Sequence, residues 1–323
     1  MRFLKRAGAR APAFFRAVTG AAHAKVSLLV LPALRAPREL YVAIGVDCDP
    51  DRDAYPARLR WRGIEALPRL FEIEDVRWTL NVRADTQVRQ YCGSAAFCWE
   101  EYHHVWRLAE ACGSAIAWHL HYFGADGTQD VSESNVLENI EVGSAALGRP
   151  DIVHMGWTFQ NDFSLRHLAR AGVRVDYSPV PRMRFHGHGG VDAYDWSRFA
   201  YRPQLWHGVR MIPAFSAFDP VLSRRFRTER VMLTTTTRPI LYRRLLDDFF
   251  ASGADFFVSY FHADEIANAV GGWRNRHLYS FDHLRANLDA LRQRADRGNY
   301  RLRFVNVREL ADILFDEGRT RYA

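Results

Sequence analysis

The stretch IAWHLHYFG, residues 116–124, combines a strand-like run of apolar residues with two histidines, His119 and His121. Side chains two residues apart on a strand point to the same face, so both imidazoles are directed at one place. Two inward-facing histidines need a reason to be desolvated together, and a shared metal ion is such a reason. The alternative is one buried structural histidine beside one exposed histidine.

From residue 40 onward, short β-rich segments like this one alternate with longer helical patterns. The alternation predicts an α/β protein whose parallel strands close into a (β/α) barrel. The strand candidates are residues 41–47, 76–82, 115–121, 151–157, 173–178, 209–215, 255–261 and 301–307. The helix candidates are residues 61–72, 98–113, 131–147, 162–171, 239–252, 281–297 and 308–317.

Local signals mark the ends of several predicted helices. Asn161 or Asp162 can cap the helix at 162–171, and Ser280 can cap the helix at 281–297. The threonines at 234–237 precede Pro239, which is a favourable first helical residue, so we expect them to act as caps.

Composition and charge predict one globular domain preceded by a basic arm. The chain has 323 residues and is 48% hydrophobic, which is enough for a sizeable core. Its net charge of +7 arises in residues 1–38, which carry eight Lys or Arg and no acidic residue, whereas residues 39–323 carry 36 basic and 37 acidic residues. We therefore expect a basic N-terminal arm (1–38), a single barrel domain (39–323) with a long aperiodic excursion at 179–208, and no nucleic-acid partner.

Cysteine usage and the basic arm bear on where the protein works. Four cysteines without a CxxC pair form no disulfide framework, so a reducing, cytoplasmic location is predicted. The arm is either a partly ordered tail or a surface anchor, which would give peripheral contact with the inner membrane. AAHA at 21–24 could be a signal-peptide cleavage site, although Arg16 interrupts the apolar region before it, so secretion stays open. The sequence does not determine the oligomeric state.

Polar residues gather where the predicted strands end. In α/β barrels the active site forms at the carboxyl ends of the strands, so these side chains are expected on one rim. A carboxylate with two imidazoles is a catalytic metal set, which predicts a divalent ion, with zinc favoured. The polar residues at the strand ends are Asp47, Asp49, Arg83, Asp85, His119, His121, His154, Asp176 and His262.

Several of these segments, in this order, resemble the polysaccharide deacetylases, metal-dependent carbohydrate esterases related to chitooligosaccharide and peptidoglycan deacetylases. The resemblance covers residues 41 to 315 approximately. The segments are VAIGVDCDPD, WHLHYF, HMGWTFQNDFSLRHLARAGVRVDYSPVP, YDWSR, FHADEI and NLDALRQRADRGNYRLRFVNVRELADI.

The resemblance implies a distorted (β/α) barrel with seven or eight parallel strands and an enzyme that hydrolyses a linear amide C–N bond. The implied reaction is metal-dependent removal of an N-acetyl or similar acyl group from a sugar in a glycan or glycolipid precursor, such as a bacterial envelope polysaccharide. Asp47 resembles the family's catalytic base, and Asp49, His119 and His121 its metal ligands. His262 resembles the histidine that protonates the leaving amine.

The sequence departs from the family pattern in three places. The family spaces its metal histidines four apart, but the residue four after His119 is Phe123. The usual adjacent acidic pair is split by Cys48. Where many relatives carry an arginine that holds the base, this chain has His154, and Arg83 is a candidate substitute.

Aromatic side chains near the predicted rim are candidates for stacking on sugar rings, although most aromatics at such positions belong to the core. The candidates are Tyr122, Trp157, Tyr177, Trp196 and Trp206.

Two other functions fit parts of the pattern. One is a barrel that binds glycan without turnover. The other is a glycosyltransferase in which Asp47 and Asp49 form the DxD that holds a metal and a nucleotide-sugar diphosphate. A nucleotide-sugar site would not require the histidine pair or His262, so these histidines favour the deacetylase.

Overall fold

The computed structural model describes residues 36–51, 60–124, 128–148, 150–186, 192–196, 199–219, 230–232, 234–267 and 278–316. The chain divides into two compact units, Met1–Ala36 and Pro37–Ala323. Almost all of the predicted arm at 1–38 lies outside the described residues, so the architecture below is that of the second unit.

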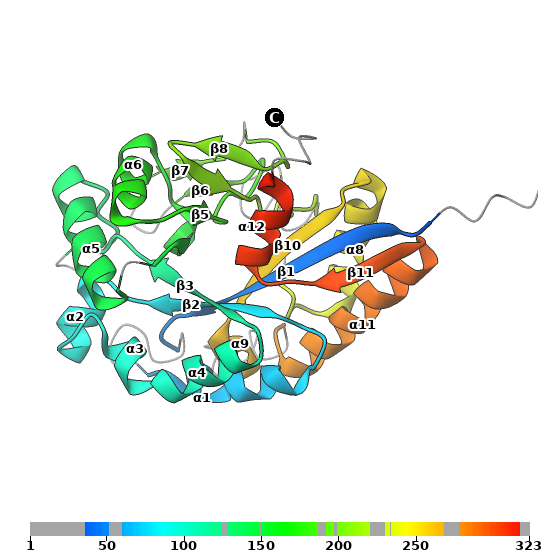
Figure 1. Cartoon of the computed structure of the whole chain (residues 1–323), viewed down its shortest axis with the longest axis horizontal. Coiled ribbons are helices and arrows are strands. Elements are labelled where there is room, and N and C mark those ends of the chain that lie inside the picture. Colours follow the sequence, from blue (N-terminus) through cyan, green and yellow to red (C-terminus); the bar gives the residue numbers. More distant parts are fainter. Residues whose placement is uncertain are drawn as a thin grey trace, which may run out of the picture. The chain divides into compact units, whose positions relative to one another are not determined.

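A nine-stranded, mostly parallel sheet forms the centre of this unit (Figure 1). Its order is β10-β1-β2-β3-β4-β5-β9-β8. The ninth strand, β11, pairs with the first half of β1, on the same edge of β1 whose second half pairs with β2. The strands are β1 (Arg38–Cys48), β2 (Trp78–Arg83), β3 (Ala115–Leu120), β4 (Ile152–Met155), β5 (Val175–Asp176), β8 (Gln204–Trp206), β9 (Val209–Met211), β10 (Phe256–His262) and β11 (Tyr300–Phe304).

All eight predicted strands are present and parallel, and β8 is an additional strand antiparallel to β9. The segment after β9 reaches the opposite edge of the sheet. There the backbone N–H of Phe215 donates to the carbonyl of Val258 in β10 (2.8 Å), which joins the two edges. The prediction of a distorted (β/α) barrel is therefore confirmed.

Helices follow most of the parallel strands, as predicted. Three of them, α6, α8 and α11, match the expected bounds, whereas α2 and α9 were not anticipated. The helices are α1 (Arg62–Ala66), η1 (Leu67–Glu72), α2 (Thr86–Cys92), α3 (Phe97–Glu101), α4 (His103–Ala111), α5 (Glu133–Ala146), η2 (Gly156–Thr158), α6 (Asp162–Ala171), α8 (Pro239–Ser252), α9 (Ala263–Ile266), α11 (Phe281–Arg297) and α12 (Val307–Phe315).

Two of the predicted caps are confirmed and one is wrong. The Asn161 side chain accepts from the Ser164 backbone N–H (2.8 Å), and the Ser280 hydroxyl accepts from the His283 backbone N–H (3.1 Å). The threonines at 234–237 do not cap α8, because its N-cap is Arg238 and no side chain bonds there. Their polar groups instead contact β10, α9 and α11.

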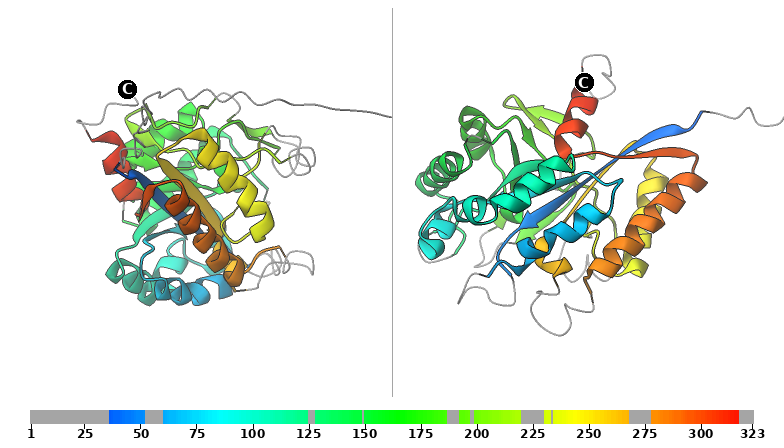
Figure 2. Two further views of the ribbon diagram at one scale, coloured as in Figure 1. Left: turned by 90° about the vertical axis from the view of Figure 1, so that its right-hand side faces the viewer. Right: turned by 60° about the horizontal axis from the view of Figure 1, so that its bottom comes forward.

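Alternating side chains of β1 enter two different apolar clusters. Leu40, Val42 and Ile44 pack with residues of α1, α8 and α11, and α8 and α11 run side by side on the outer face of the sheet (Figure 2). Tyr41 and Ala43 belong to a second cluster, with side chains of β3, β5, β10 and α12. The strand period of two places Gly45 and Asp47 on the same face as this second cluster.

The excursion at 179–208 is more ordered than predicted. It contains β6 (Arg184–His186) and β7 (Asp192–Asp195), which form an antiparallel pair, and also β8. Among the described residues, no helix is long and apolar enough to cross a membrane.

Candidate active site

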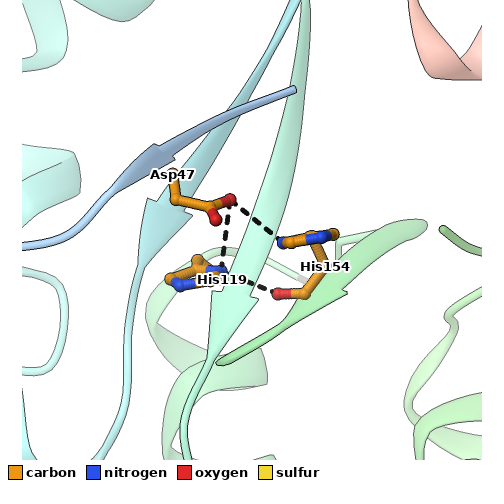
Figure 3. A group of neighbouring side chains, drawn as sticks. All are labelled: Asp47, His119 and His154. Carbon is orange, nitrogen blue, oxygen red and sulfur yellow. Dashed lines mark hydrogen bonds and ion pairs between the residues drawn. The ribbon is translucent and has the colours of Figure 1, made fainter. Parts of the chain in front are cut away.

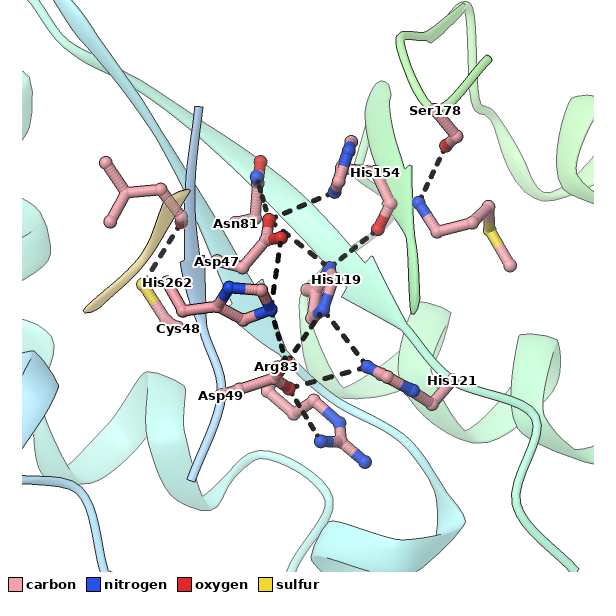
Figure 4. Close-up of polar contacts among 12 residues, drawn as sticks. Asp47, Cys48, Asp49, Asn81, Arg83, His119, His121, His154, Ser178 and His262 are labelled. Carbon is pink, nitrogen blue, oxygen red and sulfur yellow. Dashed lines mark hydrogen bonds and ion pairs between the residues drawn. The ribbon is translucent and has the colours of Figure 1, made fainter. Parts of the chain in front are cut away.

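The strand register brings the predicted rim residues together. Asp47 on β1 is paired with Asn81 on β2 and with His262 on β10. One step further along the sheet, His119 on β3 is paired with Arg83 on β2 and with His154 on β4 (Figure 4). Because parallel strands end at the same edge, five strands deliver these side chains to one site.

Asp49, His119 and His121 form a compact group of donor atoms, as predicted. The two Nε2 atoms of His119 and His121 are 3.1 Å apart. Nε2 of His119 is 3.4 Å from Oδ2 of Asp49, and Nε2 of His121 is 3.4 Å from Oδ1 of Asp49. Both histidines are buried and Asp49 is nearly so.

These separations fit one metal ion. Bonds of about 2.0–2.2 Å to zinc place neighbouring ligand atoms about 3 to 3.5 Å apart. The tautomer also fits, since Nδ1–H of His119 donates to the backbone carbonyl of His154 (2.8 Å) and leaves a lone pair on Nε2. Such a second partner is typical of a metal-binding histidine. Without a metal ion, one of the two facing ring nitrogens would have to carry a proton and donate it to the other.

The charges around Asp49 and His121 favour the metal-binding forms, whereas for His119 burial is outweighed by the charges of Asp47 and Asp49, which raise its pKa. Burial alone raises the pKa of Asp49, but its interactions with His119 and with the charge of Arg83 outweigh burial and hold that pKa well below its usual range. Burial, with the nearby Arg83 charge, lowers the pKa of His121 to about 4. Asp49 is therefore charged and His121 neutral at pH 7, which are the forms that bind metal.

Arg83 holds Asp49 and not Asp47, which corrects the expectation that it could replace the base-holding arginine. Its Nη1 donates to Oδ1 of Asp49 (2.7 Å). Its Nε donates to Asp85, its Nη2 donates to Gln87 (2.8 Å), and the side chain is buried. Asp85 also caps α2. Arg83 is thus a fixed support for the candidate ligand Asp49.

His121 takes its position because the neighbouring chain leaves room for its ring. A Cβ atom at Gly156 would lie 2.3 Å from that ring, so only glycine fits there. Phe123, at the position where the family carries its second histidine, stacks on His121 with ring centroids 5.3 Å apart. Trp157 packs edge-on against the same ring (4.8 Å) and holds a left-handed backbone (φ 51°). Backbone strain of this kind is common at functional sites.

Asp47 lies beside the ligand group and has different partners. Its Oδ1 accepts a hydrogen bond from Nδ2 of Asn81 (2.7 Å) and lies 3.0 Å from Nδ1 of His154 (Figures 3 and 4). Burial raises its pKa, but the charges of His154 and His119 outweigh burial and hold the pKa well below its usual value. Asp47 is therefore an ionised carboxylate.

Asp47, His119 and His154 form a second group with metal-ligand spacing. Its His119 atom would have to be Nδ1, which lies 3.7 Å from Oδ1 of Asp47. That nitrogen carries the proton donated to the His154 carbonyl, so it has no lone pair to offer. The group of Asp49, His119 and His121 is therefore the better ligand set.

His262 lies across the carboxylates of Asp47 and Asp49 from His119 and His121 (Figure 4). Its Nε2 is 4.0 Å from Oδ2 of Asp47 and 3.9 Å from Oδ2 of Asp49. Its Nδ1 is 3.5 Å from Oε1 of Glu265, whose other oxygen accepts from the Thr236 hydroxyl. The His262 side chain is 27% exposed, in contrast to the buried His119 and His121, so a ligand from solvent can reach it.

The aromatic candidates are divided by burial. Tyr122, Tyr177 and Trp196 are buried in the core, so the structure does not offer them for sugar stacking. Trp157 is half-buried beside His121. Trp206 donates its indole N–H to Asp162 at the start of α6 (2.8 Å). Asp176, another predicted rim residue, is buried and bonded to Ser178 and Gln160.

Sequence reasoning missed three residues of the site, namely Asn81, Glu265 and Gly156. Asn81 lies two residues before Arg83, so the strand period could have placed both on one face. Glu265 follows His262 by three residues, the spacing of neighbours on a helical turn. Gly156 has no signal of its own, because its role is apparent only when His121 lies against it.

Comparison with known proteins assigns the fold. No family model and no curated protein matches the sequence. A presumed polysaccharide deacetylase from Mycobacterium smegmatis superposes with a TM-score of 0.51 at 14% identity, over 89% of this chain and 94% of its own. A probable polysaccharide deacetylase from Pseudomonas aeruginosa PAO1 gives 0.50 at 14% identity, over 87% and 92%. An allantoinase gives 0.49 at 12% identity, over 88% and 93%.

The curled parallel sheet thus belongs to the α/β barrel class of structures. Within that class, the chain has the fold of the polysaccharide deacetylases, as its motifs predicted.

Proposed function

We propose that the protein is a metal-dependent hydrolase that removes an N-acetyl or similar acyl group from a sugar in a glycan or glycolipid precursor. One observation carries this proposal. The donor group of Asp49, His119 and His121 lies beside a buried carboxylate, Asp47, and a partly exposed histidine, His262, whose Nε2 is about equally far from Asp47 (4.0 Å) and Asp49 (3.9 Å). The deacetylase fold supports the same reaction.

The ligand set suits a first-row divalent ion, and we propose zinc. Asp49, His119 and His121 would hold it, with Arg83 fixing Asp49 and the His154 carbonyl fixing His119. Such an ion polarises an amide carbonyl and makes water more acidic.

The two remaining groups divide the proton transfers of amide hydrolysis. Asp47 is ionised and accepts the proton of the attacking water as general base. His262, on the other side of the carboxylates, donates a proton to the leaving nitrogen, which departs as an amine only when protonated. Oε1 of Glu265 lies 3.5 Å from Nδ1 of His262, the ring nitrogen that does not face the two carboxylates.

The site arrangement disfavours a DxD glycosyltransferase. In such an enzyme both aspartates serve the metal and diphosphate, but here Oδ1 of Asp47 is bonded to Asn81 and the ligands next to Asp49 are histidines. A barrel that binds glycan without turnover has the same fold, so it is separated from the proposed enzyme only by an assay.

The proposed function predicts metal-dependent release of acetate. Protein stripped with a chelator and reloaded with zinc should release acetate from N-acetylated chitooligosaccharides or peptidoglycan fragments, while the stripped protein should be at least about 100-fold slower. Acetate is measured by an enzyme-coupled assay, with heat-inactivated protein as the control. Glycan binding by the zinc-loaded protein without acetate release would favour the inactive barrel.

A further inference from the structure

We propose that Asn81, itself oriented by Tyr177, is a positioning residue that engages Oδ1 of Asp47 and leaves Oδ2 as the oxygen that accepts the proton. The proposal rests on the proposed function, because it names the working atom of the base. It adds a role for two buried polar residues, neither of which is a metal ligand or a proton donor in the mechanism above.

The first contact is between Asn81 and the base. Nδ2 of Asn81 donates to Oδ1 of Asp47 at 2.7 Å, and both side chains are buried. The strand register opposes the two residues directly, so the contact does not depend on a flexible loop. His154 adds a second group on the same oxygen, with its Nδ1 3.0 Å away.

The second contact fixes which end of the Asn81 amide faces the base. The hydroxyl of Tyr177, which directly follows β5, donates to Oδ1 of Asn81. An amide turned by 180° would present its oxygen to the carboxylate and its NH₂ to the hydroxyl, losing the attractive contact with Asp47. Because Tyr177 is buried, no water competes for this hydroxyl, and the amide stays in the donating orientation.

Gly45 makes the Tyr177 contact possible. A Cβ atom at this position would lie 2.5 Å from the Tyr177 hydroxyl oxygen. Gly45 lies two residues before Asp47 on β1 and therefore faces the same side. The strand that carries the base thus also leaves the space that the orienting tyrosine needs.

Oδ2, the second carboxylate oxygen of Asp47, faces His262. Oδ2 of Asp47 is 4.0 Å from Nε2 of His262, and Oδ2 of Asp49 is 3.9 Å from the same nitrogen. With Oδ1 engaged by Asn81 and His154, a water between these groups finds its acceptor in Oδ2. A carboxylate free to rotate would spend part of its time with neither oxygen in place, and small misplacements are costly in catalysis.

The proposal predicts a specific pattern of kinetic effects. Asn81→Ala should lower kcat for acetate release about 100-fold, with KM and bound metal unchanged, because it loosens the base and touches neither ligand nor substrate. Tyr177→Phe should lower kcat about tenfold. In the Asn81→Ala background, Tyr177→Phe should cost nothing further, because the tyrosine acts through the amide. Tyr242→Phe, which removes an equally buried hydroxyl on α8, is the control and should match wild type.

Crystal structures of zinc-loaded wild type and Asn81→Ala give a readout that does not depend on turnover. The wild type should show the Asn81 contact to Oδ1, and the variant a rotated or doubly placed Asp47 carboxylate. An unmoved carboxylate in the variant, wild-type kcat in Asn81→Ala, or multiplying losses in the double variant would overturn the proposal. A rotated carboxylate in a protein whose wild type releases no acetate would refute the proposed function and leave the positioning role standing.

Discussion

Asp47→Asn is expected to retain its metal ion and lose about 1,000-fold in turnover. General base catalysis contributes about 10²- to 10⁴-fold, and an amide cannot accept the proton that the carboxylate accepts. The substitution is nearly isosteric, so the oxygen of the introduced amide can keep the hydrogen bond from Asn81. Asp49, His119 and His121 are untouched, which is why metal content should stay at the wild-type value.

Two measurements on the purified variant check this result, namely kcat for acetate release and zinc content. Asp289→Asn on α11, which removes an exposed carboxylate paired with Arg292, is the matched control and should behave as wild type. If Asp47→Asn turns over normally, Asp47 is not the base. If it loses the metal, Asp47 belongs to the ligand set.

His262→Ala should damage amide hydrolysis far more than ester hydrolysis. The leaving amine requires a proton, and loss of its donor is expected to cost about 10²- to 10⁴-fold on an N-acetylated sugar. An activated acetate ester, such as a nitrophenyl acetate, releases a stable phenolate without protonation, so its rate should fall less than about tenfold.

The comparison of the two substrates is made on one enzyme preparation, so misfolding cannot produce the difference. His103→Ala on α4, an exposed histidine, serves as the control. Equal losses on both substrates would show that His262 supports the structure of the site and does not protonate the leaving group.

The fold could be predicted because its signals are local and repeated. Each parallel strand is a short apolar segment, and helix ends are marked by residues such as Asn161 and Gly172, which caps α6 in a left-handed conformation. The strands of the excursion at 179–208 escaped prediction because β6, β7 and β8 are three or four residues long. Their pairing depends on partners and not on periodicity.

The site could be predicted only in part. Sequence spacing predicts which side chains of one strand share a face, but contacts between strands decide which partners they meet. His119 and His121 share a face through the strand period, and Asp49 joins them because β1 and β3 end at the same edge. The partner of Arg83 could not be predicted in this way. Arg83 was a candidate to hold the base Asp47, but it donates to Asp49, and only the register of β1 on β2 decides this.

The metal content of the purified protein tests the central claim most directly. Elemental analysis is made on wild type and on a His119→Ala/His121→Ala variant whose circular dichroism spectrum and melting curve show that it is folded. The account predicts about one zinc or similar divalent ion per wild-type chain and none in the variant. No metal in the wild type after reconstitution, or the same content in both proteins, would contradict a metal site at Asp49, His119 and His121.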